Sequence, residues 1–108
     1  LPLYLLKHDF ILLKKVFAIN RNLGGYMKYK CPCCGCYTLS ERPGSWEICE
    51  VCFWEDDPVQ RKDEEYAGGA NAVNLKQARK NYIEFGACDQ RHKQYVRPQF
   101  DHEKSEID

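Results

Sequence analysis

The residues best suited to chemistry in this chain are its seven cysteines, four of which fall within positions 31–36. Cys31 and Cys34 form one C-x-x-C hook, and Cys49 and Cys52 form a second, with fourteen residues between the hooks. Two hooks at this separation are typical of a four-thiolate metal site, because each hook bends its backbone around the ion. The spacing therefore predicts that these four cysteines bind one metal ion.

A competing register uses Cys33 and Cys36, which have the same spacing. Pro32 fixes a backbone angle inside the first hook, and Gly35 lets backbone amides turn toward the sulfurs without a side chain in the way. In the competing register Tyr37 would take the place of that glycine. We therefore favour the first register.

Zinc is the expected metal and iron is the alternative, since tetrahedral thiolate sites suit both. A rubredoxin-like iron carrier would have two C-P-x-C-G hooks. The first hook, CPCCG, fits that pattern, whereas the second, CEVCFW, lacks both proline and glycine. Four cysteines fill the coordination sphere and leave no position for an activated water, so the site is predicted to be structural.

Three cysteines remain outside this predicted ligand set: Cys33, Cys36 and Cys88. Buried or metal-adjacent thiols are commonly inert, and we favour that interpretation. The alternative makes Cys33 a reactive thiol, with Cys36 as its resolving partner.

An acidic segment, FWEDDP, directly follows the second hook, and a glycine-rich segment, YAGGAN, lies further along. The aromatic pair can cover the metal, while the carboxylates are expected to form a solvated acidic surface rather than a catalytic pair. The glycine-rich segment lacks the spacing of a phosphate-binding loop. The candidate partner-binding residues in the two segments are Trp54, Glu55, Asp56, Asp57 and Asn71.

The predicted elements are few and short. Residues 37–39 and 46–48 favour β structure and are separated by the turn residues ERPG, which predicts a hairpin. Residues 55–74 carry charges, one proline and two glycines, and are expected to form a long surface loop. A second short helix is expected to run from Cys88 to Tyr95.

One helix is predicted with more support, over residues 75–85. Asn74 can cap its start, with Gln77 in the capping-box position, and Gly86 suits its end. Leu75, Ala78, Tyr82 and Phe85 make one apolar stripe. This stripe is expected to pack on Tyr37, Trp46 and Phe53. The predicted fold is a small α+β domain: a zinc-ribbon-like hairpin with a four-cysteine site and one packed helix.

Length, charge and cysteine usage limit the function classes. A chain of 108 residues has a small core, which a metal would stabilise. The formal net charge is zero, but residues 1–26 hold four of the 16 basic residues and one of the 16 acidic ones, so the remainder is mildly acidic. That balance disfavours nonspecific nucleic-acid binding. Clustered cysteines with no secretory signal or membrane-spanning segment ahead of them indicate the reducing cytoplasm.

Residues 1–26 are interpreted as an extension outside the fold. Three readings compete: a helix docked on the domain, a helix on a membrane surface, and leader sequence translated from upstream of a true start at Met27. Gly24 and Gly25 precede Met27, and glycine codons can spell a ribosome-binding sequence, so we favour the third. The domain is then expected to span 27–97, followed by a flexible tail over 98–108.

The order of these motifs resembles the CPCC family of small cysteine-rich bacterial proteins. The resemblance covers the segments YKCPCCGCYTLSERPGSWEICEVCFWEDDPVQ and YAGGANAVNLKQARKNYIEFGA, and it leaves residues 1–26 outside. It departs at Cys36, where the family pattern often has an aromatic residue. The resemblance implies the same metal-binding fold and supplies no reaction or substrate.

The sequence as a whole predicts a structural zinc domain that acts as a non-enzymatic binding module with a protein partner. Two alternatives stay open. One is a redox protein, as an iron electron carrier or a Cys33 thiol switch. The other is a nucleic-acid-binding zinc ribbon, for which basic residues of the helix and its following segment would gather on one face.

Overall fold

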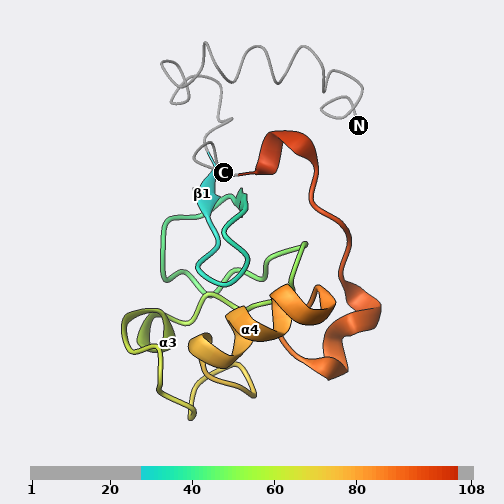
Figure 1. Cartoon of the computed structure of the whole chain (residues 1–108). Coiled ribbons are helices and arrows are strands. Elements are labelled where there is room, and N and C mark those ends of the chain that lie inside the picture. The colour runs from blue at the N-terminus through green and yellow to red at the C-terminus, as the bar shows by residue number, and fades with distance from the viewer. Residues whose placement is uncertain (1–27, 105–108) are drawn as a thin grey trace.

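A computed structural model describes residues 28–104 and shows a two-stranded sheet, an eleven-residue helix and three shorter helical turns (Figure 1). The segment 1–26, with its three competing readings, lies outside the described residues. In chain order the elements are β1 (Tyr29–Lys30), β2 (Tyr37–Leu39), α3 (Pro58–Lys62), α4 (Leu75–Phe85), and the 3-10 helices η2 (Gln90–Tyr95) and η3 (Asp101–Glu103).

The strands pair across each cysteine hook rather than between the hooks. β1 and β2 are antiparallel, with Tyr29 opposite Leu39, so the first hook forms their turn. Ile48 forms an isolated antiparallel bridge with Glu55 across the second hook. The predicted hairpin between residues 37–39 and 46–48 is therefore wrong. Each hook is itself a tight reversal of the chain, and it brings the residues on its own two sides together.

The segment predicted to be a continuous loop contains the short helix α3. The Asp57 side chain caps its start, since Oδ1 accepts the N–H groups of Val59 at 2.7 Å and Gln60 at 3.3 Å. Pro58 occupies the first turn, where a missing N–H costs nothing. The Asp57-Pro58 pair thus begins a helix within the segment that was expected to be a loop.

Helix α4 confirms the prediction for residues 75–85. Asn74 Oδ1 accepts the Gln77 N–H at 2.8 Å, and Gly86 ends the helix in the left-handed conformation with φ of 83°. The Gln77 side-chain amide donates to Asn81 Oδ1 at 2.9 Å. The buried face begins with Leu75, as the apolar stripe predicts.

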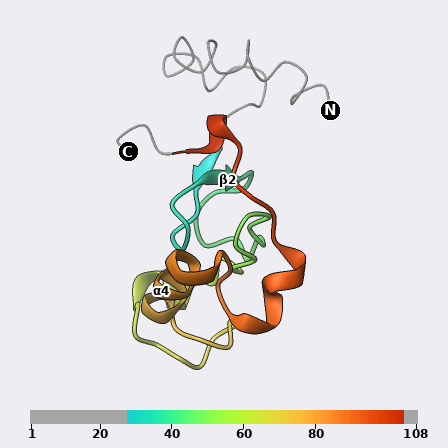
Figure 2. The same ribbon diagram turned by 45° about the vertical axis from the view of Figure 1, so that its right-hand side comes forward.

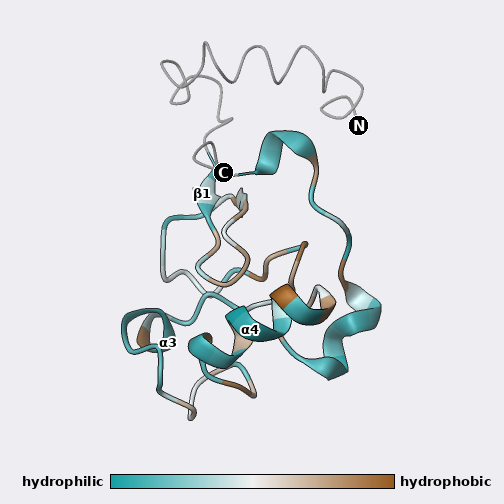
Figure 3. Ribbon diagram, in the orientation of Figure 1, coloured by the Kyte–Doolittle hydropathy of each residue, from teal (hydrophilic) through white to brown (hydrophobic). Residues whose placement is uncertain are grey.

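The core combines buried cysteines with a few large apolar side chains. Leu39, Val51, Trp54, Leu75 and Ala78 are fully buried and form one cluster with the cysteines. Hydrophilic residues cover much of the helical surface (Figure 3). Trp54 is the largest of the fully buried side chains in this cluster.

Trp46, which was predicted to pack under α4, keeps 50% of its surface exposed. Phe53 does pack against the core cluster, as expected. The prediction therefore chose the wrong tryptophan: Trp54 is buried in the core, and Trp46 is not.

The segment after α4 crosses the molecule and returns to the sheet, where η3 packs beside β2 (Figure 2). The predicted second short helix appears as η2, which ends at Tyr95. Residues 98–104 differ from the expected flexible tail, because Glu103 is buried and accepts from Arg97 at 2.7 Å and from the Phe100 N–H at 2.8 Å. Residues 105–108 lie outside the described residues. Within residues 28–104, no helix is long and apolar enough to cross a membrane.

Candidate metal centre

The two hooks have the same backbone conformation. In the first hook the Gly35 N–H donates to the Cys31 carbonyl at 2.9 Å, and in the second the Phe53 N–H donates to the Cys49 carbonyl at 2.8 Å. Each hook's first cysteine also donates its N–H to the carbonyl five residues later, at 2.8 and 2.9 Å. Gly35 and Phe53 have positive φ angles of 78° and 70°. The hooks are therefore two copies of one structural unit.

Phe53 takes the left-handed conformation that glycine supplies in the first hook. This region is unfavourable for a bulky side chain and persists only where the surroundings hold it. The Phe53 ring lies 4.7 Å from the His92 ring and 5.2 Å from the Tyr95 ring, centroid to centroid. Contacts with η2 thus hold the hook in a conformation that its own sequence does not favour.

The fold brings together the sulfurs of the four predicted ligands, Cys31, Cys34, Cys49 and Cys52. The sulfur–sulfur distance is 3.6 Å between Cys31 and Cys52 and 3.7 Å between Cys34 and Cys49, and all four atoms lie within 4.8 Å of one another. Zinc–sulfur bonds of about 2.3 Å in a tetrahedron place sulfurs about 3.8 Å apart. The cluster therefore has the donor set and the spacing that fit one four-coordinate metal ion.

Hydrogen bonds to sulfur support thiolate ligands in the second hook. Thr38 Oγ1 lies 3.0 Å from the Cys49 sulfur, and the Val51 N–H donates to the same atom at 3.4 Å. Hydrogen bonds from the other thiols, that of Cys31 foremost, lower the pKa of Cys49. Cys49 is therefore the sulfur that most readily carries negative charge.

The Cys34 and Cys52 sulfurs oppose further ionisation when no cation is present. A hydrogen bond with Cys31 raises the pKa of Cys34, and burial raises the pKa of Cys52. A low-dielectric site cannot hold several thiolates without a compensating positive charge. A divalent cation supplies that charge, and binding it must displace protons.

Metal affinity is consequently predicted to fall as the pH is lowered. The raised pKa values of Cys34 and Cys52 mean that the metal-free thiols keep their protons at neutral pH, so the ion competes with at least two protons. One pH unit of acidification should weaken binding roughly a hundredfold. Competition with a chromophoric chelator at several pH values measures this slope. A flat profile would show that thiols are not the ligands.

The remaining thiols are shielded from solvent. Cys33 is 7% exposed and Cys36 is 2% exposed. The Cys36 sulfur donates to Gln99 Oε1 at 2.9 Å, and a hydrogen bond with Cys34 lowers the Cys36 pKa. Burial raises the pKa of the Cys88 thiol to about 12. All seven cysteines are free thiols, and the burial of these three favours the inert interpretation.

The acidic segment is built into the fold instead of facing solvent as expected. Trp54 and Asp56 are fully buried and Asp57 nearly so. Asp56 pairs with Arg61 Nε at 2.9 Å and accepts the Gly44 N–H at 2.7 Å. These carboxylates have structural partners, which explains how they can be buried.

Asn71 is also buried, and it joins the glycine-rich segment to the second hook. Its side-chain oxygen accepts the Glu55 N–H at 2.9 Å, and its amide donates to the Glu55 carbonyl at 2.8 Å and to Gln60 Oε1 at 2.9 Å. Gln60 is fully buried and in turn donates to three backbone carbonyls. Glu55 keeps an intermediate exposure. Gln60 was missed from the sequence, where nothing distinguishes it from a surface glutamine.

This network requires glycine at position 69. A Cβ there would overlap the Asp57 carboxylate and lie 2.6 Å from Cδ of Gln60. We predict that Gly69→Ala lowers the free energy of unfolding by about 1–3 kcal/mol, the usual cost of overpacking, measured by denaturant unfolding.

The control is Gly68→Ala, whose Cβ meets only the hydroxyl end of Tyr66 at 2.9 Å. Tyr66 is an exposed side chain that can move aside. Equal effects of the two substitutions would contradict the steric explanation.

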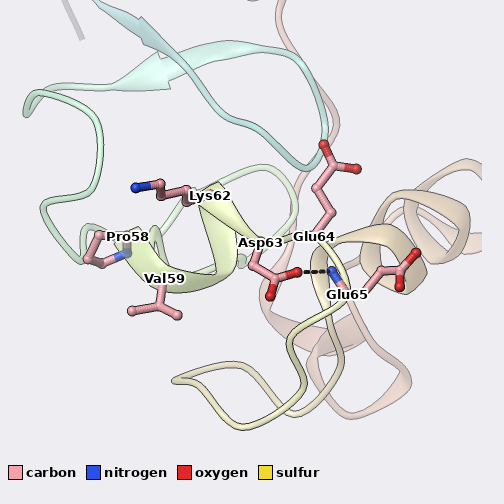
Figure 4. Close-up of a pocket in the computed structure, with 6 residues that line it drawn as sticks. All are labelled: Pro58, Val59, Lys62, Asp63, Glu64 and Glu65. Carbon is pink, nitrogen blue, oxygen red and sulfur yellow. Dashed lines mark hydrogen bonds between the residues drawn. The ribbon is translucent and has the colours of Figure 1, made fainter.

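A shallow hollow of about 680 Å³ lies along α3 (Figure 4). Four of its six lining residues are charged, and Asp63 Oδ1 accepts the Glu65 N–H at 3.1 Å within it. The lining residues are Pro58, Val59, Lys62, Asp63, Glu64 and Glu65. None of them is a cysteine, so the hollow is separate from the metal centre.

Fold and site together define a small cysteine-rich domain in which two equivalent hooks bring four thiols to one point. The model of the cysteine-rich CPCC family matches residues 29–103, and the chain belongs to that family. The match includes both hooks, α4 and the segment after α4 that contains η2 and η3. A comparison with curated proteins found no match.

Proposed function

We propose that the chain is a structural zinc protein, with one zinc ion bound by Cys31, Cys34, Cys49 and Cys52 in a zinc-ribbon-like fold. The observation that carries the proposal is the spacing of the four sulfurs, with two pairs at 3.6 and 3.7 Å. The first hook with its flanking strand pair, and the second with its single flanking bridge, each resemble one half of a zinc ribbon. Four protein ligands close the coordination sphere, so the ion holds the fold together and has no position for a substrate.

The test is metal content compared between two serine variants of the first hook. Full-length protein is purified without a histidine tag, treated with a weak chelator and assayed by elemental analysis. The native chain and Cys36→Ser are expected to keep one tightly bound zinc, and Cys34→Ser is expected to lose it. Serine at position 36 can still donate to Gln99, which makes this a matched control. Loss of metal in Cys36→Ser alone would assign the other register, and coloured protein containing iron would favour an electron carrier.

We further propose that the domain acts by binding a protein partner. Because Trp54, Asp56 and Asp57 are buried, the contact surface must be sought among the exposed large hydrophobic side chains: Trp46, Ile48, Val59, Tyr66, Ile83 and Tyr95. Side chains of this kind are common at the centres of protein interfaces. A fluorescence change of Trp46 on adding a purified candidate partner, absent in Trp46→Ala, tests this surface.

Nucleic-acid binding is less well supported, because several arginines already pair with carboxylates. Arg61 pairs with Asp56 and Arg79 with Glu64, each at 2.9 Å. Arg97 pairs with Glu103 at 2.7 Å. Paired arginines contribute little to phosphate binding, since engaging a phosphate would require breaking an existing contact.

A further inference from the structure

A second group of potential metal ligands lies where η2 begins, next to the second hook. The sulfur of Cys88, a carboxylate oxygen of Asp89 and a ring nitrogen of His92 lie within 4.8 Å of one another. His92 Nδ1 is 3.8 Å from Cys88 Sγ and 3.3 Å from Asp89 Oδ1. A tetrahedral zinc would place such sulfur and nitrogen ligands about 3.6 Å apart and nitrogen and oxygen ligands about 3.4 Å apart. The three atoms therefore already have nearly the spacing of three corners of a tetrahedron.

The backbone holds this cluster in place from three directions. The Cys88 N–H donates to the Cys52 carbonyl at 2.8 Å, and the Cys88 carbonyl accepts from Asn81 of α4 at 2.8 Å. Asp89 is the N-cap of η2, and its carbonyl accepts the His92 N–H at 3.2 Å. The first turn of η2 separates Asp89 from His92, and it brings the carboxylate to 3.3 Å from the imidazole. The ligands are thus preorganised by elements that the fold already contains.

The imidazole is also oriented by aromatic contacts. Phe53, in its left-handed conformation, places its ring against His92 and against Tyr95. Fixing a ring in one orientation is what surrounding residues commonly do for a metal-ligating histidine. The unusual backbone of Phe53 therefore serves this cluster as well as the second hook.

An unsatisfied carboxylate oxygen points to a missing cation. Asp89 is only 6% exposed, and its Oδ1 atom accepts no hydrogen bond from any residue between 28 and 104. Arg91 lies 3.6 Å from the other oxygen, but its side chain is 69% exposed, so water screens that pair. His92 Nδ1 lies 3.3 Å from Oδ1, and this contact lacks hydrogen-bond geometry. A buried carboxylate oxygen left this way is costly, and a bound cation would remove that cost.

We propose that Cys88, Asp89 and His92 form a second site, for a zinc-type divalent cation. One thiolate, one imidazole and one carboxylate suit such an ion in charge and softness. Three protein ligands leave a fourth position for water, so this ion exchanges readily, unlike the ion of the closed four-cysteine site. His92 is 27% exposed and provides the entry path.

In the test, Zn²⁺ is titrated into full-length protein that already holds one equivalent of zinc, and calorimetry measures the binding. The native chain is expected to bind a second equivalent that a weak chelator removes. His92→Gln and Asp89→Asn should each weaken this second binding roughly tenfold or more. His102→Gln is the matched control, because that histidine lies in η3 and stacks on Phe100 instead.

The first equivalent and the thermal melt are measured in every variant. Their retention shows that the four-cysteine site is intact, which separates this test from that of the proposed function. Saturation of the native chain at one equivalent would overturn the second site. Undiminished second binding in either ligand variant would overturn it too.

Discussion

Cys49→Ser is expected to lose both the metal ion and the cooperatively folded state. Cys49 is fully buried, and its sulfur lies 3.0 Å from Thr38 Oγ1 and accepts the Val51 N–H at 3.4 Å. Structural zinc contributes about 10–16 kcal/mol in small domains, whereas whole domains are stable by only about 5–15 kcal/mol. The two strands span two and three residues, so little else holds the hooks together. Thermal melting of this variant, monitored by circular dichroism, should show no cooperative transition.

The matched comparison for this variant is Cys33→Ser, which changes a buried thiol of the same hook that lies outside the ligand set. It should keep its metal and melt cooperatively, shifted by no more than a few degrees. If Cys49→Ser melted like the native chain and retained its metal, the ligand assignment would be wrong.

Asn71→Asp is expected to be the most damaging isosteric change outside the metal centre. The new carboxylate oxygen would replace an amide that donates to the Glu55 carbonyl and to Gln60 Oε1. Two acceptors would then face an unpaired buried charge, a situation that costs about 3–5 kcal/mol. Denaturant unfolding of the metal-loaded protein measures the loss.

Asn74→Asp makes the same chemical change three residues later, at the half-buried N-cap of α4, where the amide makes only a long 3.4 Å donation to the Glu65 carbonyl. Aspartate caps a helix as well as asparagine does, so the free energy of unfolding should change by less than about 0.5 kcal/mol. Similar losses at both positions would show that the buried network around Gln60 does not stabilise the fold.

The hooks and α4 could be predicted from sequence because their signals are local. A C-x-x-C pair specifies its own turn, and α4 carries its cap, its stripe and its terminal glycine within thirteen residues. The strand pairing could not be predicted in this way. Both 37–39 and 46–48 favour β structure, but composition does not show that each pairs across its own hook.

The burial of the acidic segment depends on contacts with residues distant in sequence, which is why it was not predicted. Asp57 is buried because Ala70, thirteen residues away, donates to it at 2.8 Å, and Asn71 reaches back sixteen residues to Glu55. The charges alone indicate solvent exposure, which is what composition predicts for any such run. His92 likewise carries no local sequence signal of a ligand, because only the 3-10 turn brings it to Asp89 and Cys88.

The equivalence of the hooks was hidden for a similar reason. The second hook lacks the glycine of the first, and a phenylalanine with φ of 70° takes its place. No local rule predicts that conformation for phenylalanine. It follows from packing against His92 and Tyr95, which the sequence places about forty residues downstream.

The most direct test of the central claim is X-ray absorption at the zinc edge, on full-length protein loaded with a single equivalent of zinc. Binding by the four cysteines predicts a first shell of four sulfur atoms at about 2.3 Å. The closed site should fill before any site with an open position. A first shell that contains nitrogen or oxygen at about 2.0–2.2 Å would contradict the four-cysteine assignment.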